Sequence, residues 1–159
     1  MVCCLLWLNS FVKIKVAWIG KTKEPAIQSL TNEYVKRLRH YAEVEAISLK
    51  DEATLFRMAG AKARPQERHV LVLLDGRGRQ LSSEELAGFL RGHRSRNPQP
   101  LLFAVGPADG FSEDACAEAA FVLSLGRMTL AHELARIVLL EQLYRAFTIL
   151  NGHPYHTGH

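Results

Sequence analysis

Three short, continuous runs of apolar residues with glycine-containing turns behind them constrain the fold of this chain more than any other feature. They cover residues 69–75 (HVLVLLD), 100–105 (PLLFAV) and 121–126 (FVLSLG). Strands buried on both faces have such runs, because neither face meets solvent. Residues 12–18 add an alternating strand pattern, and residues 44–50 a short strand candidate. Helical segments separate these strands, so we expect an α/β fold with a mainly parallel sheet flanked by helices.

Four segments between the strands have helical patterns. Residues 53–63 form one of them, and residues 25–41 repeat apolar side chains at a helical period. The expected inner face of the latter comprises Ala26, Leu30, Tyr34, Leu38 and Tyr41. Further helix starts are expected at the N-cap Ser82, where Glu85 completes a capping box and the helix reaches about Arg91, and at the N-cap Ser112.

The longest predicted helix covers residues 127–152 and is stopped by Asn151-Gly152. Its apolar residues 137–140 are consecutive, so they point around most of the helix and one sheet face does not cover them all. A second subunit could cover the rest. The spacing also predicts local ion pairs, Glu133 with Arg136 and Glu141 with Arg145.

Length and composition predict a single domain over residues 12–159, preceded by an extension at residues 1–11. The 159 residues are 48% hydrophobic, enough for one core. The extension has no basic start and no cleavage site, and it is too short to span a bilayer, so no membrane association is expected. Three cysteines without metal-ligand spacing favour a reducing, cytoplasmic location. The net charge of +4 suits a polyanionic partner.

Loops at the carboxyl ends of the predicted strands are the expected ligand site, as in other parallel sheets. The three candidates are DGRGRQ, GPADGF and LGRMTLAH. The sequence contains neither a phosphate-binding P-loop motif nor a complete dinucleotide fingerprint.

Histidines supply the candidate reactive groups. His132 lies near the start of the long helix, where the helix dipole favours a neutral ring that accepts or donates a proton; satisfying the helix end is the simpler alternative. His153, His156 and His159 raise the alternative of a metal-binding tail. Their spacing and the absence of a nearby completing ligand argue against it, so we expect no metal.

Three longer segments together resemble a known family. They are LLDGRGRQLSSEELA, FAVGPADGFSEDA and LSLGRMTLAHELARIVLLEQLYRAFTILNGHPYH. They are similar to the SPOUT-class methyltransferases that modify N3 of a pseudouridine in bacterial 23S ribosomal RNA, the RlmH family. The resemblance runs from about Lys13 to His156 and implies a homodimer with a C-terminal trefoil knot, S-adenosylmethionine as methyl donor, and a substrate within the assembled ribosome.

Position by position, the resemblance implies two groups of site residues. The expected cofactor-binding residues are Leu74, Gly106, Leu125, Gly126, Arg127, Met128, Thr129 and Leu130. The expected catalytic residues are His132, Arg136, Tyr155 and His156, with the tail beside the methyl donor. Either histidine is a candidate base, and Arg136 or Arg145 a candidate for stabilising the pseudouridine anion.

The sequence departs from the family pattern at Pro107, Ala131 and Thr157, where a second glycine, a proline and a basic residue are usual. Pro107 removes a backbone donor from the cofactor loop. A non-catalytic RNA-binding or ribosome-assembly module with the same fold is therefore the alternative function. Basic residues of the first helix and of residues 91–96 are candidate contacts to RNA phosphates in either case.

Overall fold

The computed structural model describes residues 11–60 and 63–157, apart from the side chain of His156. Within these residues one sheet and its helices follow each other in the order β1 (Lys13–Ile19), α1 (Pro25–Leu38), β2 (Glu43–Leu49), α2 (Glu52–Ala59), β3 (Val70–Gln80), α3 (Ser83–Arg96), β4 (Leu101–Val105), α4 (Glu113–Glu118), β5 (Phe121–Ser124), α5 (His132–Leu150) and the 3₁₀ turn η1 (Pro154–Thr157).

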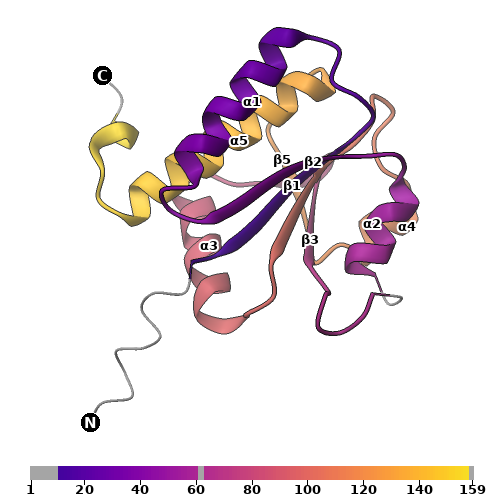
Figure 1. The fold of residues 1–159 in the computed structure, drawn as a ribbon, viewed down its shortest axis with the longest axis horizontal. Helices are drawn as coiled ribbons and strands as arrows, with labels where there is room; N and C mark the ends of the chain where they lie inside the picture. Colours follow the sequence, from indigo (N-terminus) through magenta and orange to yellow (C-terminus); the bar gives the residue numbers. More distant parts are fainter. Residues whose placement is uncertain (1–10, 61–62, 158–159) are drawn as a thin grey trace.

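Five described strands form a wholly parallel sheet in the order β2-β1-β4-β3-β5 (Figure 1). Strand β4 is central, and all five of its residues are buried. Its last residue, Val105, lies opposite Trp18 near the end of β1 and opposite Leu74 within β3, so the pairing of these three strands stops at one edge of the sheet. The predicted α/β fold with a parallel sheet is confirmed. The strand order is compatible with the predicted knot, which stays a prediction.

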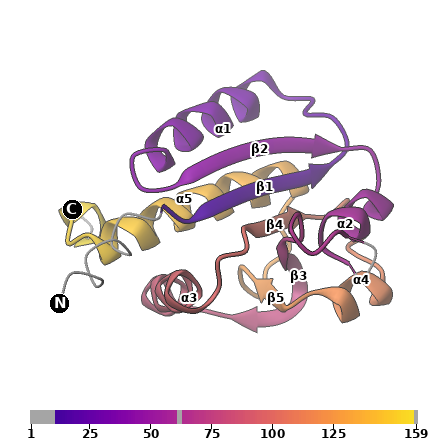
Figure 2. The ribbon, with the colours of Figure 1, turned by 60° about the horizontal axis from the view of Figure 1, so that its bottom comes forward.

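Helices cover both faces of the sheet unequally (Figures 1 and 2). Helices α1, α3 and α5 pack on one face, over a large core that includes Phe103 and Leu143. The short helices α2 and α4 pack on the other face around Leu73 and Phe111. On that second face, the amino ends of β1 and β2 carry two cross-strand ion pairs, Lys13–Glu43 at 3.8 Å and Lys15–Glu45 at 3.5 Å.

Helix α1 buries a different stripe from the one predicted. Its buried residues are Ile27, Thr31, Val35 and Leu38, whereas the side chain of Leu30 is 43% exposed. The apolar pattern did not predict this face, because the buried Thr31 is a polar residue and was not counted as part of the apolar stripe. Its hydroxyl donates to the carbonyl oxygen of Ile27 at 2.7 Å and is thereby satisfied inside the core.

Helix ends follow the capping signals better than the apolar periods. The Ser82–Glu85 capping box and the Ser112 N-cap are both present, although α3 continues to Arg96 and α2 ends at Ala59. Helix α5 begins at His132 rather than at residue 127, and it ends at Asn151 with Gly152 at φ +67°.

Strand β3 extends to Gln80, through residues that were predicted to form a glycine-rich loop. Its pairing with β5 is irregular, because both Leu74 and Arg79 lie opposite Leu123. Gly78 makes this close return possible. A Cβ at Gly78 would lie 2.5 Å from the carbonyl oxygen of Val122.

Of the two predicted ion pairs on α5, one forms. Arg145 lies 2.6 Å from Glu141. Glu133 instead accepts a hydrogen bond from the backbone N–H of Lys23 at 2.7 Å, and Arg136 donates to Thr22. Both side chains are thus hydrogen-bonded to the connection between β1 and α1 instead of to each other.

Residues 1–10 of the predicted extension lie outside the described residues, and Phe11 is exposed. In the part of the chain that the structure describes, no helix is both long enough and apolar enough to cross a membrane.

Two glycine-to-alanine variants test the close approach of β3 to β5. Gly78→Ala should lower the free energy of unfolding by about 2 kcal/mol or more, because the new methyl group meets backbone that cannot move aside. Gly88→Ala, within α3, has open space around the new Cβ and should raise the free energy of unfolding by up to about 1 kcal/mol. Urea unfolding measures both. Equal effects would contradict the packing described here.

Candidate functional site

A cavity of about 400 Å³ opens at the carboxyl edge of the sheet. It is lined by residues 74–77 of β3, which lie at and beyond the last pair of β3 with β4, by the segments that follow β4 and β5, and by the start of α5. All eight residues predicted to bind the cofactor line it, namely Leu74, Gly106, Leu125, Gly126, Arg127, Met128, Thr129 and Leu130. The structure thus brings together three loops that are far apart in the sequence, at the place where parallel sheets bind ligands.

The loop after β5 forms one wall and is held at its base. Gly126 has φ +142°, a backbone conformation that favours glycine. The hydroxyl of Ser124 donates to the carbonyl oxygen of Gly126 at 3.0 Å and accepts from its N–H at 3.3 Å. Beyond this turn Met128 is 86% exposed. The side chain of Met128 is therefore not packed against the rest of the described chain.

The loop after β4 folds its own aromatic residue against the strand end. A Cβ at Gly106 would lie 2.9 Å from the ring of Phe111, so only glycine allows this ring to pack so closely. Pro107, which departs from the family pattern, accepts a hydrogen bond from the N–H of Gly110 at 2.9 Å. The proline closes the turn with its carbonyl oxygen, a role that needs no N–H.

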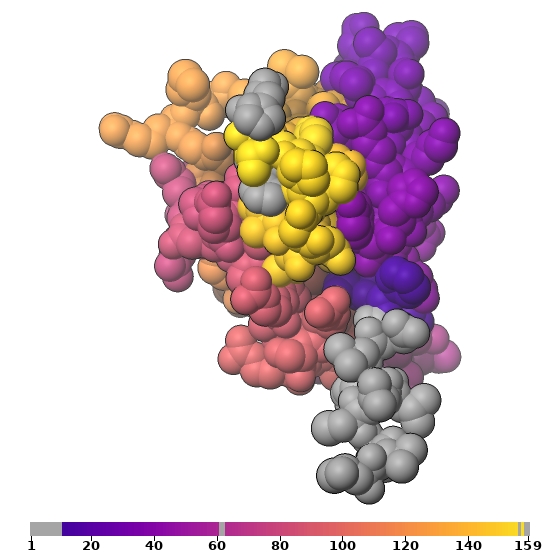
Figure 3. Space-filling model, turned by 90° about the vertical axis from the view of Figure 1, so that its left-hand side faces the viewer, coloured from indigo at the N-terminus to yellow at the C-terminus, as the bar shows by residue number. Residues whose placement is uncertain are grey.

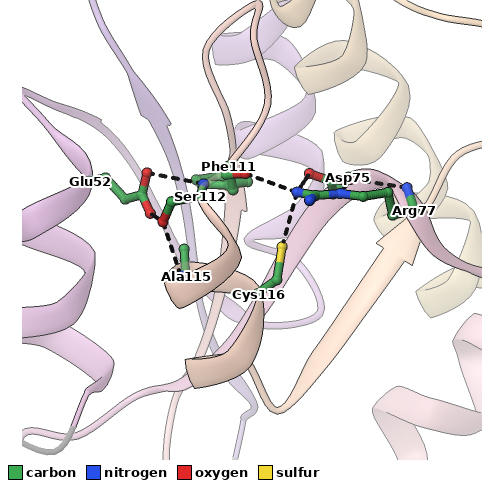
Figure 4. A network of polar contacts seen from close by, with 7 residues as sticks. All are labelled: Glu52, Asp75, Arg77, Phe111, Ser112, Ala115 and Cys116. Atoms are coloured by element: carbon green, nitrogen blue, oxygen red, sulfur yellow. Dashed lines mark hydrogen bonds and ion pairs between the residues drawn. The ribbon is translucent and has the colours of Figure 1, made fainter.

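Arg77 ties the first two loops together (Figure 4). Its guanidinium binds the Asp75 carboxylate through Nε at 2.9 Å and Nη2 at 2.8 Å. Nη2 also donates to the carbonyl oxygen of Phe111 at 2.8 Å and to Sγ of Cys116 at 3.3 Å. We call these four residues the Arg77 clasp. Because Asp75 and Arg77 line the cavity, the clasp fixes part of its wall.

Charge pairing explains the electrostatics of the clasp. Hydrogen bonds from Arg77 lower the pKa of Asp75 to about 2, although burial opposes this shift. The same pairing raises the pKa of Arg77. Asp75 is therefore a carboxylate at all physiological pH values and does not act as a proton donor.

The next residue of this loop anchors it to the second face of the sheet. Ser112 accepts from the N–H of Ala115 at 3.1 Å as the N-cap of α4, and its hydroxyl donates to the carboxylate of Glu52 (Figure 4). Glu52 is the first residue of α2. The loop after β4 is thus bound to β3 on one side and to α2 on the other.

Among the predicted catalytic residues whose side chains the structure describes, only His132 lines this cavity. It is the first residue of α5, and the N-cap Ala131 supplies no side-chain acceptor to the helix start. Its ring is half-buried. Proton acceptance by His132 stays a prediction.

Arg136 does not line the cavity but lies behind it, between α5 and the end of β1. Its side chain is 1% exposed, and its guanidinium carbon lies 3.9 Å from the centre of the Trp18 ring. Nη1 donates to the hydroxyl of Thr22 at 2.9 Å. Burial lowers the pKa of Arg136, a shift that Glu133 partly opposes.

Tyr155 belongs to η1, and this C-terminal segment, yellow in Figure 3, lies beyond the end of α5, at the surface between α1 and α3. Its hydroxyl donates to Glu141 at 3.2 Å, its ring makes an edge contact with Tyr144, and the Arg145 guanidinium lies 5.1 Å from its centre. Burial and the nearby Glu141 carboxylate raise its pKa to about 12. Helix α5 rises about 27 Å between its first and last residues, so Tyr155 and His132 are far apart within one chain.

The histidine tail is only partly described. Nδ1 of His153 accepts from the N–H of Tyr155 at 3.2 Å. The side chain of His156 and all of His159 lie outside the described residues. Among the described ones, no group of three or more His, Cys, Asp or Glu side chains is placed to hold a metal ion.

A second cavity of about 590 Å³ lies at the amino edge of the sheet, lined by residues that include Lys13, Lys15, Glu43 and Glu45. These four side chains pair with one another across β1 and β2. The smaller cavity is the better candidate site, because three loops and a helix start converge on it.

The sequence interpretation missed the Arg77 clasp. DGRGRQ was treated as a loop, and its Asp75-x-Arg77 spacing was the available signal. Such spacing is common in turns, where aspartate binds the backbone N–H two residues on; here the N–H of Arg77 donates to Asp75 at 2.9 Å. The contact to Phe111, 34 residues later, depends on the fold.

Comparison with known proteins gives a consistent family match. A family model described as a predicted SPOUT methyltransferase matches residues 12–156. A protein of Koribacter versatilis named ribosomal RNA large subunit methyltransferase H is 55% identical over 148 residues, which cover 93% of this chain and all of that relative. A protein of the same name from Geotalea uraniireducens is 44% identical and covers 91% of this chain and 99% of the relative.

Solved structures of low sequence identity share the fold. A probable methylase family protein from Haemophilus influenzae superposes with a TM-score of 0.59 at 10% identity, covering 91% of this chain and 70% of that one. The SpoU methyltransferase AviRb from Streptomyces viridochromogenes gives a TM-score of 0.55 at 16% identity, with 90% and 62% covered.

The acid dependence of folding tests the Arg77 clasp. Because the pKa of Asp75 is lowered in the folded chain, its contribution to stability is complete above about pH 4 and is lost as the pH falls towards 2. Between pH 5 and 2.5 the wild type should lose about 1 kcal/mol more unfolding free energy than Asp75→Asn. Urea unfolding at both pH values measures the difference. Parallel losses would show that Asp75 makes no such pairing.

Proposed function

Because the chain belongs to the family of SPOUT methyltransferases, we propose that it transfers a methyl group from S-adenosylmethionine to N3 of a pseudouridine in 23S ribosomal RNA. The observation that carries the proposal is the convergence of Leu74, Gly106 and residues 125–130 on one cavity. The names of the relatives, which cover nearly the whole chain, support the ribosomal RNA substrate.

The cavity suits the proposed methyl donor. Its volume of about 400 Å³ lies within the range of small-molecule sites. Gly106 and Gly126 let the backbone approach a ligand closely, so loop N–H and carbonyl groups are available to hold the adenine edge and the ribose. The Arg77 clasp would keep the first two loops at a fixed spacing before the donor binds.

Methyl transfer requires little from the protein beyond position and one proton acceptor. N3 of the pseudouridine loses its proton and attacks the methyl carbon in line with the breaking C–S bond, and the sulfonium leaves as a neutral thioether. His132 borders the cavity and is a candidate base; His156 remains the other. Our proposal involves no metal ion.

A homodimer would bring the two halves of the proposed site together. Within one chain the cavity and Tyr155 lie at opposite ends of α5, so Tyr155 cannot serve its own chain's cavity without rearrangement. Leu134, in the first turn of α5, and Leu30 of α1 are exposed apolar side chains that a second copy would cover. We therefore propose that the tail of one subunit completes the nucleotide pocket of the other.

Basic side chains of α3 would contribute to holding the RNA. Arg91, Arg94 and Arg96 are exposed at the end of this helix. No described carboxylate forms an ion pair with them. Contacts of this kind are independent of sequence and weaken as salt rises.

Labelled methyl transfer tests the proposed activity directly. Ribosomes that lack the modification are incubated with the protein and methyl-labelled S-adenosylmethionine, and the labelled nucleotide is mapped. We expect label at N3 of a pseudouridine in the large-subunit RNA. A folded protein that gives no label on competent ribosomes would favour the non-catalytic RNA-binding module instead.

Complementation between inactive variants tests the shared site. His132→Ala and Tyr155→Ala should each lower methyl transfer strongly as homodimers, as should His156→Ala, with the dimer intact in each case. Co-expression of the His132 and Tyr155 variants should restore about a quarter of wild-type activity, because half of the randomly formed dimers retain one complete site of two. If each cavity used its own chain's tail, co-expression would restore nothing.

A further inference from the structure

Arg136 is a buried cation with an incomplete set of partners. Its side chain is 1% exposed, yet Nε and Nη2 have no hydrogen-bond partner among the described residues. Thr22 accepts from Nη1 alone. The indole N–H of Trp18, beneath the guanidinium, is also buried and without a partner.

No carboxylate among the described residues forms an ion pair with Arg136, although the charge of Glu133 acts on it from nearby. Glu133 lies one turn earlier on α5, but its carboxylate accepts from the N–H of Lys23 rather than from Arg136. The connection between β1 and α1, which faces Arg136, carries two cations, Lys21 and Lys23, and one carboxylate, Glu24, directly before α1. A buried charge without a partner destabilises a fold, and an apolar residue of similar size is often more stable there. Retaining Arg136 at such a place is explained if it receives an anion.

The start of α5 adds a second set of unused donors. The N-cap Ala131 has no side-chain acceptor, so the N–H groups of residues 132–134 have no partner within the helix. A helix start of this kind attracts anions. Arg136 lies one turn beyond His132 on this helix, and side chains on a helix lean towards its amino end. The start of α5 and the Arg136 guanidinium therefore both lack a hydrogen-bond acceptor, and an anion would supply one to each.

This region adjoins the cavity. His132 and Ala135 of α5 line it, and so does Val105, which lies directly opposite Trp18 in the sheet. One bond, from Nη1 to Thr22 on the connection between β1 and α1, holds the guanidinium in its observed place. Release of that bond would free the side chain towards the cavity wall.

We propose that Arg136 and the first turn of α5 form a receptor for an oxyanion, and that its ligand is the carboxylate of the methyl donor. The proposal rests on the proposed function and gives Arg136 a different task from stabilising the pseudouridine anion. The donor's carboxylate is favoured over an RNA phosphate because it enters through the cavity that Ala135 and Val105 already line. Binding would satisfy the guanidinium and the helix start together.

Removal of the carboxylate from the ligand tests the receptor without changing the protein. Titration calorimetry compares S-adenosylmethionine with its decarboxylated analogue. The wild type should bind the analogue about tenfold or more weakly, as expected for loss of a charge-assisted hydrogen-bond pair. Arg136→Gln should bind S-adenosylmethionine about tenfold more weakly than the wild type and should no longer distinguish the two ligands.

Matched variants separate recognition from folding. Arg37→Gln removes another arginine that lies over aromatic rings, on α1, and should keep the wild-type preference for the carboxylated donor. Arg136→Met should raise Tm while losing the preference, because a methionine needs no partner in this place. Arg136→Lys, which keeps the charge but not the planar fork, should retain part of the preference.

The outcomes discriminate between sources of the oxyanion. Equal wild-type affinity for both ligands, together with a raised KM for ribosomes and a weaker salt dependence in Arg136→Gln, would identify an RNA phosphate as the ligand. Equal affinity with unchanged ribosome kinetics in Arg136→Gln would overturn the receptor. Failure of the wild type to bind S-adenosylmethionine at all would instead contradict the proposed function.

Discussion

Backbone pairing of β4 with β1 on one side and β3 on the other is the constraint on which the rest of the structure depends. The three strands are parallel, and their pairing with one another stops at the same level, at Trp18, Val105 and Leu74. Whatever follows each strand must therefore emerge at one edge. Strand β5 continues this edge, and α5 begins there. The cavity is a consequence of strand register before any of its side chains is considered.

The apolar runs predicted this architecture because doubly buried strands have a simple pattern. The runs around Leu73, Phe103 and Leu123 all became strands, and the loops behind them meet in one cavity. Periodicity was less informative for α1. Its inner face includes Thr31, a polar residue whose hydroxyl is hydrogen-bonded to the carbonyl oxygen of Ile27 in the same helix. Local pattern could not predict the extension of β3 to Gln80 either, since it depends on contact between Gly78 and Val122.

The family resemblance predicted which residues would line the cavity, but not how they are held. Strand pairing brings Leu74 and Gly106 together, and Arg77 then ties β3 to the segment after β4 through contacts to residues 34 and 39 positions later. The resemblance also grouped Arg136 and Tyr155 with His132, whereas within one chain Arg136 lies behind the cavity and Tyr155 lies beyond the other end of α5. Such distances are set by the direction of α5 and the sheet it packs on, which no sequence window contains.

Two arginines near the cavity illustrate opposite ways of keeping a cation. Arg77 is partly exposed and has a carboxylate, a carbonyl and a thiol around it. Arg136 is buried with one hydroxyl and an aromatic ring. The first arrangement stabilises the folded chain as it stands. The second is costly unless another group arrives, which is the usual mark of a residue kept for binding.

Helix α5 also acts as a measured spacer, since it joins the cavity at His132 to the aromatic cluster around Tyr155. One inserted residue would lengthen it by about 1.5 Å and turn everything beyond by about 100°, moving Tyr144 and Tyr155 off their packing face. Insertion of seven residues would nearly restore the face but add about 10 Å. An insertion cannot keep both the length of this helix and the direction in which its later side chains point. The number of residues in α5 is therefore far less free to vary than the number in the loops.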